Sequence, residues 1–270
     1  MQSSPTASLA HVCHSEWSKV YDPAEDSWLL SDAICGDYPV WGGGVGVILE
    51  LGSGSGAVCT SVLLYLRGLR EGTLGSTLLS PPPPAALMVA CDLSPHACRV
   101  TAATGEANGV SSHLDVVQCD LLSPLVSRLS GAVDLFIFNP PYVPTPREEV
   151  PSPSAFAGDT PLEDTLPAAW AGGEDGRQVI DRALPLLPKL LRHPGAGAGA
   201  GEEGDVGGVA YWLLLKENDP KGLIAAVGDL GLQGKVVAHR TAANEKLCVV
   251  RFQWKRGASS SNSSSSGGRE

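Results

Sequence analysis

The feature that most constrains the fold of this chain is a regular alternation of short apolar runs with segments of helical spacing. The first four runs show no two-residue alternation, which is typical of strands buried on both faces of a parallel sheet. Helical segments between such strands indicate an α/β fold built on one main sheet. The expected strands are 45–51, 86–91, 114–119, 133–138, 209–215, 234–239 and 246–252, and the expected helices are 24–35, 56–70, 95–108, 175–192 and 220–230.

Glycine and proline interrupt this pattern in a few places. The chain has 32 glycines and 21 prolines, and their excess lies in separate patches. Such patches lack the apolar surface that a packed core requires, so we expect them to be flexible insertions within one domain. The predicted organisation is one folded domain over 17–256 with insertions near 71–85, 150–168 and 194–208, a disordered segment 1–16 and a disordered tail 257–270.

The charge and the cysteines exclude several classes of protein. A formal net charge of −10 at pH 7 disfavours a general nucleic-acid binder, because phosphate contacts need Lys and Arg. The seven cysteines contain no Cys-x-x-Cys pair, which indicates reduced thiols in an intracellular protein and no metal site. The sequence has no apolar run of about 18 residues and no basic start before an apolar segment. We therefore expect neither a membrane span nor a secretory signal.

Polar side chains stand at the ends of the first four expected strands. Glu50 lies near the end of the first strand, while Asp92, Asp120 and Asn139 end the second, third and fourth. The carboxyl ends of parallel strands meet at one edge of the sheet, and ligands of such sheets bind beyond that edge. The four polar groups therefore predict a ligand site there.

The stretch ELGSGSG follows the first strand and suits a close ligand. Gly52, Gly54 and Gly56 allow a tight turn and a near approach of the backbone to a bound molecule. With Ala57 the stretch also fits the dinucleotide pattern G-x-G-x-x-A, so the glycines alone do not identify the ligand. A carboxylate at Glu50 would repel a pyrophosphate, whereas it would attract the amino group or sulfonium of S-adenosylmethionine.

Asp92 and Asp120 fit the same cofactor. Asp92 can accept hydrogen bonds from two ribose hydroxyls. It lies further beyond the glycines than the usual interval of about 20 residues, because the insertion 71–85 intervenes. Asp120 can accept from the exocyclic amine of adenine, with Leu93 and Leu121 flanking the ring.

The fourth strand delivers Asn-Pro-Pro-Tyr, which suits a planar nitrogen acceptor. Asn139 offers a side-chain carbonyl, and Pro140 offers a backbone carbonyl without an N–H. Pro141 restricts Pro140 to an extended conformation and so fixes the direction of its carbonyl. Both carbonyls can accept from one NH2 group and hold its nitrogen toward a methyl donor, while Tyr142 stacks on the flat group.

These motifs resemble those of a known family. Asn-Pro-Pro-Tyr together with ELGSGSG is similar to the class I S-adenosylmethionine-dependent methyltransferases that act on exocyclic or amide nitrogens. Three further stretches resemble the eukaryotic and archaeal HemK-type glutamine methyltransferases. They are VYDPAEDSWLL at 20–30, AWAGGEDGRQVIDR at 169–182 and KENDP at 216–220.

The resemblance implies a Rossmann-like fold with a seven-stranded, mostly parallel sheet and helices on both faces. It implies that Asn139, Pro140 and Tyr142 are the catalytic residues and hold the substrate nitrogen. The cofactor S-adenosylmethionine would be held by Tyr21, Pro23, Glu25, Ser27, Glu50, Gly52, Gly54, Asp92, Leu93, Asp120, Leu121 and Asn139.

The resemblance also implies a substrate and a partner. The substrate is the glutamine in the Gly-Gly-Gln loop of a class 1 translation termination factor, and the partner is a small zinc-binding activator protein that covers an apolar edge of the sheet. This substrate indicates a cytoplasmic location, with a nuclear share also open. Three alternatives stay open: methylation of lysine on histone H4, methylation of adenine N6 in nucleic acid, and a binding module without activity.

Overall fold

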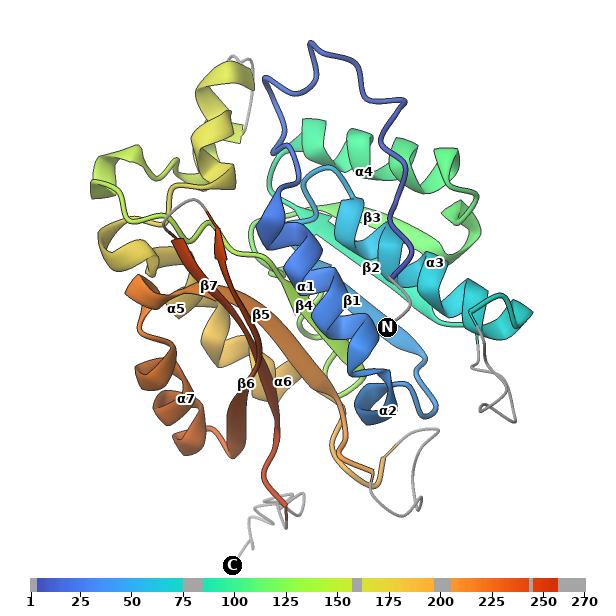
Figure 1. Cartoon of the computed structure of the whole chain (residues 1–270). Coiled ribbons are helices and arrows are strands. Elements are labelled where there is room, and N and C mark those ends of the chain that lie inside the picture. Colours follow the sequence, from blue (N-terminus) through green and yellow to red (C-terminus); the bar gives the residue numbers. More distant parts are fainter. Residues whose placement is uncertain (1–3, 75–84, 157–161, 197–204, 243–244, 257–270) are drawn as a thin grey trace, which may run out of the picture.

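The strands of this chain form one twisted sheet in its computed structural model (Figure 1). Each expected strand is present, and the last two are longer than predicted because they pair with each other along most of their length. The strands are β1 (Val47–Leu51), β2 (Leu87–Asp92), β3 (Leu114–Gln118), β4 (Leu135–Phe138), β5 (Val209–Leu215), β6 (Leu232–Ala242) and β7 (Glu245–Trp254). The structure describes residues 4–74, 85–156, 162–196, 205–242 and 245–256.

The strand order in the described chain is β3-β2-β1-β4-β5-β7-β6. The first five strands in this order are mutually parallel, and β7 runs antiparallel between β5 and β6. This is the expected seven-stranded, mostly parallel sheet of the class I methyltransferase fold. The order reverses beside β1, so β1 and β4 flank the position where such sheets bind ligands.

Helices cover both faces of the sheet, and each face has its own apolar core (Figure 1). Leu30 and Ile34 belong to the core under α1, α2 and α3, whereas Ile180 and Leu187 belong to the core under α5, α6 and α7. Among the described residues, no helix has both the length and the apolar character needed to cross a membrane. The helices are α1 (Glu25–Gly36), α2 (Tyr38–Trp41), α3 (Ala57–Glu71), α4 (Pro95–Ala107), α5 (Gln178–Ala183), α6 (Leu187–Leu190) and α7 (Pro220–Asp229), with 3-10 turns at Ser111–His113, Arg147–Glu149, Pro153–Phe156, Leu162–Ala169, Glu174–Gly176, Leu184–Leu186 and Lys216–Asn218.

The segment expected as one helix over 175–192 is broken. Its parts are α5, a 3-10 turn and α6, and the breaks coincide with Pro185 and Pro188. Proline lacks the N–H that would continue the ladder of a helix, so each one restarts the backbone hydrogen bonds. The prediction of one continuous helix is therefore wrong, although Ile180, Ala183, Leu187 and Leu190 of the segment are buried.

The N-terminal segment 4–20 has a defined place, where the sequence predicts disorder up to residue 16. Ser8 and Asn108 exchange two hydrogen bonds of 2.8 and 2.9 Å. Val12 and Val20 are buried against α4 in a small apolar cluster. A few well-spaced apolar residues hold this segment, and such isolated contacts leave no periodic signal in a sequence. Only parts of the expected insertions, at 75–84, 157–161 and 197–204, lie outside the described residues, as does the expected tail 257–270.

A buried ion network ties the opposite end of the sheet together. The Arg192 guanidinium donates to Asp134 at 2.6 Å and to Asp205 at 3.2 Å, and each of the three side chains is about one-tenth exposed. The second carboxylate oxygen of Asp134 accepts from the N–H groups of Gly46 and Val47 at the start of β1. The network therefore fixes β1 relative to β4, far from the carboxyl ends of both strands.

We expect Arg192→Ala to destabilise the protein strongly, because it leaves two buried carboxylates without their counter-ion. The expected loss in the free energy of unfolding is about 3–5 kcal/mol, measured by urea denaturation. The control is Arg240→Ala, which breaks an exposed ion pair with Glu25 and should lose about 0–1 kcal/mol. Equal losses for the two variants would contradict a structural role for the buried network.

Candidate active site

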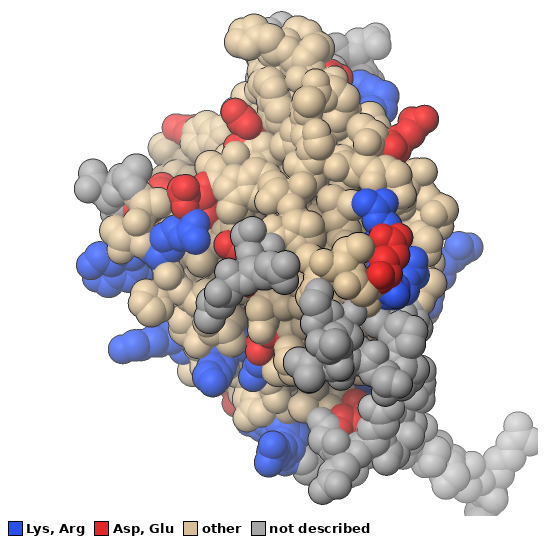
Figure 2. All heavy atoms as spheres, turned by 45° about the vertical axis from the view of Figure 1, so that its right-hand side comes forward, with Lys and Arg blue, Asp and Glu red and all other residues tan. Residues whose placement is uncertain are grey.

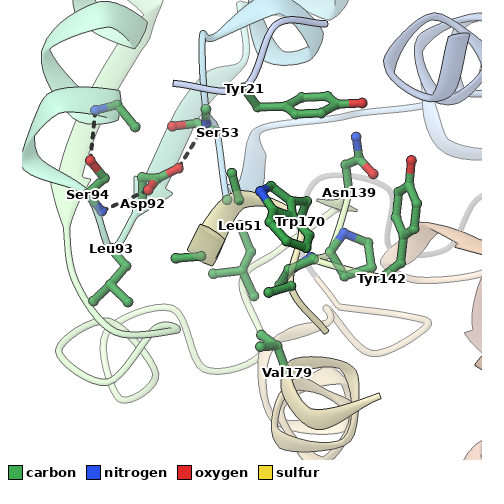
Figure 3. A pocket seen from close by; sticks show the side chains of 18 of the residues that line it. Tyr21, Leu51, Ser53, Asp92, Leu93, Ser94, Asn139, Tyr142, Trp170 and Val179 are labelled. Atoms are coloured by element: carbon green, nitrogen blue, oxygen red, sulfur yellow. Dashed lines mark hydrogen bonds between the residues drawn. The ribbon is translucent and has the colours of Figure 1, made fainter. Parts of the chain in front are cut away.

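A cavity of about 670 Å³ opens beyond the carboxyl ends of β1, β2 and β4. This is the edge of the sheet where the sequence predicts a ligand site, and the volume is typical of small-molecule sites. Figure 3 shows side chains of several elements converging on the cavity. Of the expected site residues, it is lined by Tyr21, Pro23, Ser27, Glu50, Gly52, Gly54, Asp92, Leu93, Asp120, Leu121, Asn139, Pro140 and Tyr142.

Glu25 is the expected site residue that does not line the cavity. It is exposed and forms an ion pair with Arg240 on β6. The next residue, Asp26, is 3% exposed and does line the cavity. Neighbouring residues of a helix point about 100° apart, so only one of these two acids can face inward at the start of α1.

The glycine loop between β1 and α3 is held tightly on one side and open on the other. Gly56 has a φ of 76°, and a Cβ there would lie 2.9 Å from the Cα of Thr101 on α4. Gly54 has a φ of 55°, yet a Cβ there would meet nothing within 4 Å. Thr101 also donates to the Gly54 carbonyl at 3.1 Å. The loop therefore presents bare backbone to the cavity, as a closely bound ligand requires.

Asp92 is fixed by backbone donors at the end of β2. One carboxylate oxygen accepts from the N–H of Gly54 at 2.9 Å, and the other accepts from the N–H of Ser94 at 2.9 Å (Figure 3). Burial raises the pKa of the Asp92 carboxyl, and these backbone donors offset part of the rise. Each oxygen keeps a further lone pair, so the carboxylate can still accept from a ligand.

Glu50 is a buried carboxyl with one oxygen that has no partner. Its side chain is 2% exposed, and Oε2 accepts no hydrogen bond from the described residues. Burial raises the pKa of Glu50 to about 8, and contacts with Cys59 oppose this only in part. An unpaired buried carboxyl is unfavourable unless a ligand provides the counter-charge. The site therefore fits a ligand with a cationic group.

Asp26 determines which way the Asn139 side chain faces. The Nδ2 of Asn139 donates to Oδ2 of Asp26 at 2.9 Å, and the Tyr142 hydroxyl donates to the same oxygen at 3.2 Å. The Oδ1 of Asn139 is buried and accepts no hydrogen bond from the described chain. Burial, and then the nearby Asp26 carboxylate, raise the pKa of Tyr142, so its hydroxyl stays protonated and donates. Asn139 thus offers the cavity a fixed acceptor.

The third strand end carries an ion pair and an unusual backbone. The Arg182 guanidinium on α5 donates to Asp120 at 2.6 Å, and both side chains are partly exposed. Leu121 has a φ of 50°, a conformation that costs a leucine about 1–3 kcal/mol. All three residues line the cavity. The surrounding structure must therefore hold Leu121 in this conformation in the cavity wall.

The motifs at 169–182 and 216–220 hold the segment that follows Asn139. Asn218 is fully buried; its Nδ2 donates to the carbonyls of Tyr142 and Asp175 at 2.9 Å each, and its Oδ1 accepts from Leu215 at 2.7 Å. Gly176 packs so closely that a Cβ would lie 1.9 Å from the Tyr142 carbonyl oxygen. These two motifs therefore position Tyr142 through its backbone.

Sequence reasoning did not name several residues of the cavity, among them Asp26, Trp170 and Arg182. A signal existed for Asp26, which precedes Leu30 and Ile34 by four and eight residues and so shares their buried face of α1. Trp170 lies in the stretch 169–182 that resembles the family, but no spacing of residues indicates that its side chain reaches the cavity. Chemically, the assembled cavity can bind a cation at Glu50 and a planar nitrogen group at Asn139.

We expect Glu50→Gln to raise the stability of the ligand-free protein, and to do so more strongly as the pH rises. An unfolded Glu has a pKa near 4.3, so a native pKa of about 8 means that the native state binds more protons between these values. The wild-type protein then loses stability from about pH 4.3 to pH 8, and the variant does not.

The measurement is thermal unfolding at pH 6 and pH 8. At pH 8 the variant should unfold several degrees higher, since about 1 kcal/mol corresponds to roughly 2–4 °C for a chain of this size. The control is Asp32→Asn, a change at an exposed carboxylate of α1. It should leave the unfolding temperature unchanged at both pH values. An equal gap between Glu50→Gln and wild type at both pH values would mean that Glu50 does not titrate in this range.

Comparison with known proteins identifies the family of the chain, although no protein-family model matches it. Methyltransferase HEMK2 of Mus musculus is 37% identical over 248 residues, which cover 92% of this chain and 96% of that protein. The eRF1 methyltransferase catalytic subunit mtq2 of Schizosaccharomyces pombe is 34% identical over 261 residues, which cover 93% and 96%.

A solved structure agrees with this result at the level of the fold. It is Mtq2 of E. cuniculi, whose complex with Trm112 is described as responsible for methylation of the eRF1 translation termination factor. The two chains share 22% identity with a TM-score of 0.50, over 88% of this chain and 99% of that one. With two relatives above 30% identity along nearly their whole length, the resemblance of the motifs is confirmed: the chain belongs to the HemK-type methyltransferases, in the subgroup that contains HEMK2 and mtq2.

Proposed function

We propose that this chain transfers a methyl group from S-adenosylmethionine to the side-chain amide nitrogen of glutamine in the Gly-Gly-Gln loop of a class 1 translation termination factor. The observation that carries the proposal is the buried, unpartnered Oδ1 of Asn139, which Asp26 holds toward the cavity. The names of mtq2 and of the E. cuniculi complex, which refer to eRF1, support the same substrate class.

The residues of the cavity fit the cofactor. The unpaired Oε2 of Glu50 suits the cationic amino-acid end, and the open face at Gly54 leaves room beside the loop. Asp92 suits the ribose hydroxyls, and Asp120 suits the adenine amine with Leu121 against the ring. Tyr21, Pro23 and Ser27 line the same cavity and would close it from the N-terminal side. The bound cofactor supplies an activated methyl group on its sulfonium.

Asn139 and Pro140 would hold the acceptor. The two N–H groups of the glutamine amide donate to Oδ1 of Asn139 and to the carbonyl oxygen of Pro140. These hydrogen bonds raise the electron density on the amide nitrogen and direct it toward the methyl donor. Tyr142 would lie against the flat amide, since Asn218 and Gly176 fix its backbone. The amide loses one proton to solvent once the new carbon–nitrogen bond has formed.

We further propose that the chain works with a small zinc-binding activator protein in the cytoplasm. The relative mtq2 is named as a catalytic subunit, and the E. cuniculi Mtq2 was solved together with Trm112. A translation factor as substrate implies a cytoplasmic enzyme, with a nuclear share also open. The activator should therefore be present in any assay of activity.

The proposed reaction predicts that methyl transfer depends on the glutamine side chain. The assay uses this protein co-expressed with its activator, labelled S-adenosylmethionine, and a termination factor that carries Gly-Gly-Gln or Gly-Gly-Ala. Label should enter the first factor and not the second. Label on a histone H4 peptide or on duplex DNA, with none on either factor, would replace the proposal with lysine or adenine methylation.

The proposed acceptor site predicts that Asn139→Ala lowers kcat by at least about 100-fold while affinity for S-adenosylmethionine is largely kept. Asp26→Asn should have a smaller effect, roughly tenfold on kcat, because the Asn139 amide loses its ionised acceptor and can turn. Isothermal titration measures the affinity, and the labelled assay measures kcat. Asp32→Asn, at an exposed site of the same helix, is the control. Near wild-type turnover of Asn139→Ala would contradict the mechanism.

A further inference from the structure

Trp170 is a large apolar side chain that stays exposed at the mouth of the cavity. It is 36% exposed, and it lines the cavity (Figure 3). Among the described residues, the other large exposed hydrophobic side chains are Leu87 and Val236, and neither lines the cavity. An exposed tryptophan beside a binding cavity is the type of residue that dominates recognition of a partner.

The backbone of Trp170 is firmly held although its side chain is exposed. Its N–H donates to the carbonyl of Pro167 at 3.1 Å, and its carbonyl accepts from the N–H of Val143 at 3.0 Å. Val143 and Ala171 form an isolated parallel bridge. In a parallel bridge the preceding residues are also neighbours, which places Trp170 beside Tyr142. The indole is thus a wall of the cavity next to Tyr142, and the backbone that carries it is held in place.

The part of the cavity around Trp170 is mainly apolar. The proposed cofactor groups, Glu50, Asp92 and Asp120, lie at the ends of the strands, whereas the outer part is formed by the connection after β4. Arg147 of this connection and Glu245 of β7 also line the cavity and carry charges, and Glu245 acts on Tyr142. The remaining outer lining includes Val143, Val150, Pro151, Phe156, Leu166 and Trp170.

We propose that Trp170 is a specificity-determining residue, against which the two residues preceding the acceptor glutamine lie, and that it selects glycine at both positions. This inference rests on the proposed function, because it concerns the same substrate loop. The side chain of the substrate glutamine must pass Tyr142 to reach Asn139. The backbone of that glutamine therefore lies outside Tyr142, beside Trp170. Its neighbours in the substrate then meet the indole.

Glycine fits such a wall for a simple physical reason. A peptide unit without Cβ atoms can lie flat against an aromatic face and gain dispersion contacts along its whole length. A Cβ facing the ring holds the peptide away from it and moves the glutamine amide out of reach of Asn139. An apolar, rigid wall therefore distinguishes Gly-Gly-Gln from other glutamines by shape.

The test measures kcat and KM for wild type, Trp170→Phe and Trp170→Ala on termination factors that carry Gly-Gly-Gln, Ala-Gly-Gln or Gly-Ala-Gln. Each protein is assayed with its activator. Wild type should lose about tenfold or more in kcat/KM on either alanine-substituted factor. Trp170→Ala should raise the KM for Gly-Gly-Gln about tenfold with little change in kcat, and should reduce the preference for glycine. Trp170→Phe should keep most of the wild-type KM for Gly-Gly-Gln and most of the preference for glycine, since it retains a flat ring.

Two further readouts separate recognition from folding. Trp170→Ala should keep wild-type affinity for S-adenosylmethionine and a wild-type unfolding temperature, because its side chain is partly exposed. Val236→Ala, at an exposed site on β6 outside the cavity, should change none of the measured values. An unchanged preference for glycine in Trp170→Ala would overturn this inference and leave the proposed function standing. No label from wild type on Gly-Gly-Gln would overturn the proposed function and, with it, this inference.

Discussion

The parallel register of the central strands is the constraint on which the site depends. Leu51 of β1 pairs with Cys91 of β2 on one side and with Phe138 of β4 on the other. The next residues along all three strands therefore emerge at one level, and they are Gly52, Asp92 and Asn139. A shift of one residue in any strand would turn its side chains to the opposite face. The buried ion network at the far end of β1 and β4 keeps this register.

Two buried oxygens in the cavity accept no hydrogen bond from the described residues, and both are positioned for a ligand in advance. Oε2 of Glu50 and Oδ1 of Asn139 are both held in place before any ligand arrives. Their neighbours Cys59 and Asp26 fix them and leave their free lone pairs available. Unsatisfied buried oxygens reduce the stability of the ligand-free protein. The same oxygens need no reorganisation when a cation and an amide bind, which is an advantage for catalysis.

The sequence predicted those parts of the fold and site that leave a local pattern. Strands β4 and β5 were found because each is a continuous apolar run, and the strand-end acids were found because parallel strands end together. The break within 175–192 was missed because apolar spacing continues through the prolines. Glu25 and Asp26 are adjacent acids, and only the rotation of α1 about its axis determines which one faces inward. Trp170 reaches the cavity because the Val143–Ala171 bridge holds its backbone there. The sequence of a long connection does not show which of its residues will pair.

The N-terminal segment 4–20 gives the cavity one wall that belongs to neither of the two main cores. Lys19, Val20 and Tyr21 line the cavity, yet the segment is held by a separate small cluster that includes Val12. Regions with few buried apolar contacts open at much lower free energy than the whole fold. This wall can therefore detach while the sheet stays folded. The free energy of opening this wall is then set by the small cluster and not by the global stability of the protein.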